Sequence, residues 1–296
     1  MDRTAPSNFS VKNILEVNDW QLLQMNLPWP KKLALSAGQE RRVWIWLPPG
    51  YEKSSDDYSV LFMHDGQNVF RDEDATFGTC WGMIDAQLQL EEPMIVVAIE
   101  GQNNGLQRFN EFSPWLNSDL DYWKSSPGLE AGGDADAYLN FVVDTIVPMV
   151  HHRFRCRRNP EHNILGGSSM GGFVSLYAAT RFESVFGKFM AMSTATWFAQ
   201  ESLLECLKTH DFKKTTCIYV DIGTCETSND QIVEFPAIYL SGNEKLFQLL
   251  QVSLTSNQFL SKICRGDIHN EAAWAKRLPG ALRWLNAKKC EVDHIK

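Results

Sequence analysis

Ser169 lies in a pattern of residues that is typical of a serine nucleophile. The segment Gly167-Ser168-Ser169-Met170-Gly171 fits G-x-S-x-G, with a short apolar run before it and a helical pattern after it. This context predicts a sharp strand-to-helix turn that lifts the serine oxygen clear of a sheet. The glycine on each side lets neighbouring backbone approach without a Cβ clash. Ser168 competes for the role, but the spacing to Gly167 and Gly171 selects Ser169, whose chemistry would be attack on a carbonyl carbon.

His269 is the candidate general base. In hydrolases built on a strand, elbow and helix, the chain order is serine, acid and then histidine, each beyond the carboxyl end of a strand. Before the terminal tail, two histidines follow Ser169, namely His210 and His269. His210 lies in a polar segment before an expected strand, which is the wrong end of the sheet. His269 follows the last expected strand and precedes the last expected helix, where the base belongs.

Three carboxylates compete for the role of the acid that orients the base. Asp221 is still within the strand expected over residues 217–221, whereas Glu226 and Asp230 lie beyond it. Glu226 comes just after the turn Gly223-Thr224-Cys225, where a carboxylate can reach the imidazole and hold its tautomer. We therefore favour Glu226 and keep Asp230 as the alternative.

Two backbone amides are candidates for an oxyanion hole. The amide of Met170 begins the helix after the elbow, and helix N-termini direct N–H groups at developing negative charge. Gly66 follows a buried strand in the loop that supplies the second donor in such hydrolases, so we assign the amide of Gln67. We interpret His64 as a structural hydrogen-bonding residue. The spacing of His64, Asp65 and His269 matches no zinc signature, and we expect neither a metal nor another cofactor.

The elements that would position these residues alternate between strand and helix, which predicts an α/β fold with a mostly parallel sheet and helices on both faces. Continuous apolar runs at 59–63 and 93–99 predict central strands, and 42–47 reads as an edge strand that stops at Pro48-Pro49-Gly50. Further strands are expected at 162–165, 188–192, 217–221 and 260–264. Helices are expected at 137–150, from the glycine-rich elbow at 166–172 to about 181, within 239–252 and at 271–287. We expect an N-terminal extension over 1–40 and one domain over 41–290, with an irregular insertion at about 101–135.

Composition narrows the class of protein. The 296 residues carry a net charge of −8 and are 44% hydrophobic, which fits a globular chain and disfavours nucleic-acid binding. The basic cluster at 151–158 is interpreted as a solvated helix end. No stretch approaches the ~20 apolar residues of a membrane span, and the N-terminus does not resemble a signal peptide. Seven scattered cysteines indicate reduced thiols, and we expect a cytoplasmic protein.

Several longer segments together resemble one known family, the putative-esterase family of α/β-hydrolases. This family includes enterochelin-esterase-like and esterase D-like enzymes and, more distantly, mycolyl transferases. The segments that carry the resemblance are 60–70, 167–172, 223–226 and 269–271, with Trp274, Arg277-Leu278-Pro279 and Ala281-Leu282-Arg283-Trp284. The resemblance implies the α/β-hydrolase fold, a triad of Ser169, Glu226 and His269, and oxyanion donors at Gln67 and Met170. Cys225 stands where the family often has a polar or charged residue.

The resemblance also covers residues 104–115, which are similar to a family segment beside the active site. Within it we expect Arg108 and Glu111 to form an ion pair with each other first and to contact substrate second. Trp81, Trp115 and Trp197 lie in expected loops or near strand ends and are candidates for an apolar wall around the substrate.

The sequence thus predicts a serine carboxylic-ester hydrolase that acts on a small-molecule ester through an acyl-enzyme. Two alternatives stay open: an acyltransferase of the same fold, and a binding protein that keeps the fold without turnover. The complete set of serine, histidine and glutamate speaks against the second alternative.

Overall fold

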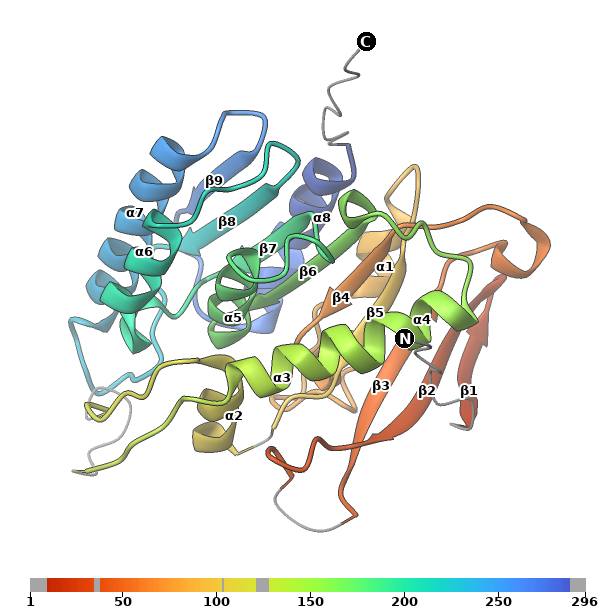
Figure 1. The fold of residues 1–296 in the computed structure, drawn as a ribbon, viewed down its shortest axis with the longest axis horizontal. Coiled ribbons are helices and arrows are strands. Elements are labelled where there is room, and N and C mark those ends of the chain that lie inside the picture. The colour runs from red at the N-terminus through yellow and green to blue at the C-terminus, as the bar shows by residue number, and fades with distance from the viewer. Residues whose placement is uncertain (1–9, 35–37, 103, 121–127, 288–296) are drawn as a thin grey trace.

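One nine-stranded sheet organises the computed structural model (Figure 1). The structure describes residues 10–34, 38–102, 104–120 and 128–287. Expectations for Cys290, for residues 1–9 and 288–290, and for positions 103 and 121–127 of the insertion lie outside the described residues. The strands run in the order β1-β2-β3-β5-β4-β6-β7-β8-β9. Their bounds are β1 Val11–Val17, β2 Trp20–Pro28, β3 Glu40–Leu47, β4 Val60–Met63, β5 Ile95–Ile99, β6 Asn163–Ser168, β7 Lys188–Met192, β8 Cys217–Gly223 and β9 Phe259–Cys264.

The half of the sheet from β5 to β9 is parallel, and the N-terminal strands are antiparallel. Strands β4 and β5 are buried at every residue, as their continuous apolar sequences predict for strands covered on both faces. The chain order reverses between β4 and β6, because β5 pairs on one side of β4 and β6 on the other. Such a reversal opens a crevice at the carboxyl ends of the strands, which is where α/β sheets bind ligands.

Helices cover both faces of the sheet, as the sequence predicts (Figure 1). One core cluster lies under the face with most of the helices and includes Phe173, Phe189 and Phe198. The other is packed by α1 and α8 and includes Trp44, Trp46 and Leu282. The helices are α1 Met83–Leu88, α2 Gly105–Phe112, α3 Ala135–Phe141, α4 Val147–Arg153, α5 Met170–Ala179, α6 Gln200–Lys208, α7 Phe235–Ser253 and α8 Glu271–Ala287. A five-residue π-helical segment, Val142–Ile146, joins α3 to α4, and α8 contains Pro279.

The expectation that residues 42–47 form an edge strand is wrong. β3 has a neighbour on each side, since it pairs antiparallel with both β2 and β5. Residues 11–28, which the sequence suggested were part of an extension, supply β1 and β2 to the same sheet. Buried side chains on β2, among them Leu22, Met25 and Leu27, attach these strands to the core.

No helix in the described ranges combines the length and the apolar character that crossing a bilayer requires. The six cysteines in these ranges are free thiols.

Candidate active site

The carboxyl ends of the central strands surround a cavity of about 440 Å³. It contains the candidate nucleophile and the candidate base together, although 100 residues of chain separate them. The cavity is lined by Asp65, Gln67, Asn68, Thr76, Phe77, Gln102, Gly105, Arg108, Phe109, Ser168, Ser169, Trp197, Thr227, Ser228, Asp230, His269, Asn270, Glu271 and Trp274.

Ser169 occupies the turn between β6 and α5 in a strained backbone conformation. Its φ of 56° and ψ of −122° lie outside the regions that non-glycine residues normally adopt. The turn is closed by hydrogen bonds from the Ser169 amide to the Met192 carbonyl and from the Ala195 amide to the Ser169 carbonyl, at 2.9 and 3.2 Å. A Cβ at Gly167 would lie 3.0 Å from the backbone of Gly171, and a Cβ at Gly171 would lie 3.3 Å from the Cβ of His64, so the turn leaves little room for a side chain at either glycine of the motif.

Backbone strain gathers at this end of the sheet. Among the described residues, five non-glycine residues have a positive φ, and three of them follow strands that border the cavity. These are Asp65 after β4, Ser169 after β6 and Ser193 after β7, with φ of 53°, 56° and 48°. Strained residues commonly cluster at functional sites, because the surrounding structure must hold them.

Glu226 contacts the imidazole of His269. The carboxylate is fully buried, and its Oε2 lies 2.8 Å from Nδ1 of His269. An ionised carboxylate only accepts, so Nδ1 carries the proton and Nε2 is left as the acceptor. The alternative acid, Asp230, lines the cavity from an exposed position. The geometry therefore places Glu226, and not Asp230, at the histidine.

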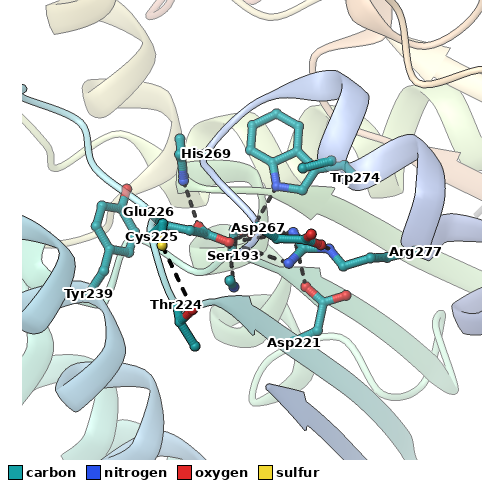
Figure 2. Close-up of polar contacts among 12 residues, drawn as sticks. Ser193, Asp221, Thr224, Cys225, Glu226, Tyr239, Asp267, His269, Trp274 and Arg277 are labelled. Carbon is teal, nitrogen blue, oxygen red and sulfur yellow. Dashed lines mark hydrogen bonds and ion pairs between the residues drawn. The ribbon is translucent and has the colours of Figure 1, made fainter. Parts of the chain in front are cut away.

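The second oxygen of Glu226 is held by a buried polar network (Figure 2). Oε1 accepts hydrogen bonds from the Ser193 hydroxyl at 2.5 Å and from the Gly223 amide at 2.6 Å. The Ser193 oxygen in turn accepts from Nε1 of Trp274 and from Nη2 of Arg277, both at 2.8 Å. Every hydrogen-bonding position of the Ser193 hydroxyl is used, which fixes its orientation and that of Glu226.

Arg277 compensates the negative charge buried behind the site. Its guanidinium lies 3.4 Å from Glu226, 3.5 Å from Asp221 and 3.7 Å from Asp267. Burial raises the pKa of Asp221 to about 6, against the opposing effect of Arg277. Desolvation alone would lower the pKa of Arg277, but the combined attraction to Asp221, Glu226 and Cys264 outweighs it, so the pKa is raised.

The loop after β4 brings Gln67 to the cavity. A Cβ at Gly66 would lie 2.5 Å from the backbone of Ala98, so this position needs glycine for the loop to pack against the end of β5. The Gln67 side chain accepts a hydrogen bond from the Gly101 amide at 3.0 Å, which fixes the loop. Met170 begins α5 immediately after Ser169, with its side chain fully buried. Nδ1 of His64 lies 2.6 Å from the Tyr138 hydroxyl, and burial lowers the His64 pKa to about 3, in keeping with a structural role.

Arg108 and Glu111 do not pair with each other, which corrects the expectation from the sequence. Arg108 lines the cavity and binds Asp65 with two hydrogen bonds of 2.8 and 2.7 Å. Glu111 forms its ion pair with Arg41 of β3, and neither residue lines the cavity. Although three residues apart on α2, the two side chains have separate buried partners from other elements. Burial raises the pKa of Glu111 to about 7, while Arg41 opposes the shift.

Of the three tryptophans expected at the substrate, Trp197 alone lines the cavity. The ring of Trp81 packs 5.4 Å from that of Trp274 in the core under α1 and α8. Trp115 packs against Phe173 and Tyr177, with ring centroids 6.0 and 5.5 Å away. The expectation of a substrate contact is therefore corrected for Trp81 and Trp115, whose apolar rings serve the core.

Within the described ranges, no group of three or more His, Cys, Asp and Glu side chains has an arrangement that could hold a metal ion.

Comparison with known proteins places the chain in a family. The model of the family described as "Putative esterase" matches residues 35–285. The chain belongs to this family. It is accordingly an ester-hydrolysing enzyme, built on an α/β-hydrolase fold.

One bacterial protein and several solved structures are similar to most of the chain. The Bacillus subtilis (strain 168) protein "Uncharacterized protein YbbA" is 25% identical over 250 residues, which are 84% of this chain and 93% of the relative. An IroE-like serine hydrolase from Shewanella oneidensis superposes with a TM-score of 0.66 at 21% identity, over 93% of this chain and 79% of the other. Siderophore hydrolase EstA from Aspergillus nidulans gives 0.66 at 17% identity, over 90% and 95%. These structures share the fold of this esterase.

Several residues around the site of this esterase could not be predicted to lie there from the sequence. Ser193 and Tyr239 carry no motif. Tyr239 is fully buried, with its hydroxyl 2.8 Å from Ser228 and its ring 5.0 Å from that of His269. Trp274 and Arg277 were visible in the sequence as part of the family segment, and their three-residue spacing places both on one side of α8. That spacing is the sequence feature from which their shared contact with the residues around Glu226 could have been predicted.

Proposed function

We propose that the esterase hydrolyses a small-molecule carboxylic ester through an acyl-enzyme on Ser169, with His269 as general base and Glu226 as the residue that orients it. The observation that carries the proposal is the 2.8 Å contact between Glu226 and Nδ1 of His269, in the cavity that Ser169 also lines. This contact leaves Nε2 free to accept a proton from a serine hydroxyl.

The proposed reaction has two steps. The Ser169 oxygen attacks the ester carbonyl while His269 takes its proton, and the amides of Gln67 and Met170 stabilise the oxyanion. His269 then protonates the leaving alcohol, and an acyl group remains on Ser169. In the second step His269 takes a proton from water, which attacks the acyl-enzyme and releases the carboxylic acid.

The surroundings of the cavity support this chemistry. Arg108 lines the cavity and is held in place by Asp65. The aromatic rings of Phe109 and Trp197 line the same cavity. A cavity of about 440 Å³ is within the range of small-molecule sites. Among similar proteins, one from Emericella nidulans is called "Siderophore enterobactin esterase" and is 33% identical over 79 residues, which are 27% of this chain and 26% of the relative. Siderophore esters therefore belong among the substrates to assay.

The test is hydrolysis of a series of p-nitrophenyl esters, from acetate to long acyl chains. We expect the wild type to show chain-length-dependent turnover, and Ser169→Ala and His269→Ala each to lose at least about a thousandfold in kcat. Ser168→Ala is the matched control and should keep most of the activity. Full activity in Ser169→Ala would overturn the proposal.

A further inference from the structure

The cavity carries more negative than positive charge. Among the described residues, three carboxylates line it, those of Asp65, Asp230 and Glu271, against one guanidinium, that of Arg108. Arg108 makes two hydrogen bonds to Asp65, so this pair is close to neutral. Asp230 and Glu271 then remain as the two carboxylates of the described lining for which no ion pair forms.

Glu271 is the more informative of the two, because it is buried. It is 4% exposed, it borders the cavity as the first residue of α8, and it follows His269 by two positions. Within the described ranges, no lysine or arginine lies at ion-pair distance from its carboxylate. Desolvation raises its pKa and the charge of Asp65 adds to the rise, while a hydrogen bond from its own backbone amide and the charges of His269 and Arg108 oppose the rise without cancelling it. The N-terminus of α8 favours a carboxylate at this position, but it would favour an exposed carboxylate equally. It therefore does not explain why Glu271 is buried.

A buried carboxylate without a cation is unfavourable unless something compensates it. A cationic group placed in the cavity would do so. Such a group would also meet aromatic faces, since Phe109, Trp197 and Trp274 line the same space. Phe109 and Trp197 hold each other edge to face, with centroids 6.0 Å apart. Carboxylates combined with aromatic rings are the surroundings that bind substituted ammonium groups.

We propose that the ester accepted by this cavity carries a substituted ammonium group in its alcohol part. The inference rests on the proposed function. In that reaction His269 protonates the leaving alcohol, so the alcohol lies on the side of His269, and Glu271 is two residues further along the same segment. Glu271 is the main recognition group and Asp230 a secondary one at the exposed rim.

The experiment compares two esters of one acyl group, chosen as the best acyl chain of the p-nitrophenyl series. One is the choline ester, and the other is its neutral isostere, in which carbon replaces the quaternary nitrogen. Release of acid is followed by titration at neutral pH and low ionic strength. We expect the wild type to prefer the choline ester by about tenfold or more in kcat/KM. Glu271→Gln should reduce this preference at least about fivefold, mainly through KM, and Glu244→Gln, an exposed carboxylate on α7, should keep it.

A second measurement does not depend on a variant. Free choline should inhibit hydrolysis of the neutral ester competitively, and more strongly than the neutral alcohol of the same shape. Equal turnover of the two esters by the wild type, or a preference that survives in Glu271→Gln, would overturn the inference while leaving the proposed function intact. Absence of turnover for the neutral, choline and p-nitrophenyl esters alike would instead overturn the proposed function, and the inference with it.

Discussion

Ser193 shows how much of the site depends on a residue with no part in the proposed reaction. Its hydroxyl joins Glu226 to Trp274 and Arg277, and its φ of 48° turns the chain so that this contact can form. The oxygen of Glu226 that faces away from His269 is therefore saturated, and the other is left to the imidazole. A histidine held by a carboxylate with a fixed position keeps one tautomer ready for proton transfer.

Replacing Glu226 tests this arrangement. Glu226→Gln keeps the shape of the side chain but removes the charge, and an amide group facing Nδ1 favours the wrong tautomer of His269. We expect kcat to fall by about a hundredfold to ten-thousandfold with little change in KM. Steady-state kinetics on the best p-nitrophenyl ester measure the effect, with Glu244→Gln as the exposed carboxylate control. A variant with kcat within a few-fold of the wild type would show that Ser169 and His269 work without the acid.

Some contacts of the site are predictable from local sequence, and others depend on how distant elements pack. Ser169, Glu226 and His269 could each be selected from a local sequence pattern, because the chemical role of each residue constrains the residues around it. The partners of Arg108 and Glu111 could not be predicted, since Asp65 and Arg41 come from other elements and depend on how α2 packs. Spacing along one helix says nothing about such tertiary partners.

At the scale of elements, the strand-to-helix turn around Ser169 depends on close backbone packing.

The strands differ in how well the sequence predicts them. Strands that are apolar throughout, such as β4 and β5, were predictable, because burial on both faces leaves a continuous apolar run in the sequence. The position of β3 was not, because being an edge strand depends on whether another segment pairs with it. β2 pairs with β3, and β1 pairs with β2 to extend the sheet further, although β1 is mostly exposed and its pairing is interrupted by an irregularity between Asn13 and Leu15.

Two glycine substitutions separate the elbow from an ordinary helix position. Gly167→Ala would place a Cβ 3.0 Å from the Gly171 backbone, so we expect the turn to shift, activity to fall at least about tenfold and the free energy of unfolding to decrease.

The Cβ added by Gly280→Ala on α8 would meet only the end of Lys262 at 3.5 Å, and we expect a gain of about 0.5–1 kcal/mol in the free energy of unfolding with unchanged activity. Urea unfolding and ester hydrolysis measure both. An active, equally stable Gly167→Ala variant would contradict the role of close packing.

Across the whole molecule, buried carboxyl groups outside the cavity lining make the free energy of unfolding depend on pH. Asp221 and Glu111 each face one arginine, and burial raises their pKa values to about 6 and about 7. The folded state then binds these protons more tightly than the unfolded chain does. Their contribution to stability is fully present below the ordinary carboxyl pKa and is lost as pH rises through the raised values.

The free energy of unfolding should therefore fall with rising pH between about pH 4 and pH 7 through these two groups. Asp221→Asn removes one of them, and we expect the slope between pH 4 and pH 6 to become shallower by up to about 1.4 kcal/mol per pH unit. Urea unfolding at several pH values measures the slopes, and comparing slopes avoids any pH-independent effect of the substitution. Identical slopes in the variant and the wild type would contradict the raised pKa of Asp221.

The most direct test of the central claim is to find the acyl group. The esterase is mixed with its best p-nitrophenyl ester, quenched within the first turnover and analysed by peptide mass spectrometry, while nitrophenol release is followed in parallel. We expect a burst of about one nitrophenol per enzyme and a single acyl adduct on Ser169, both absent from Ser169→Ala. An adduct on another residue such as Ser168 or Cys225, or undiminished hydrolysis by Ser169→Ala, would contradict it.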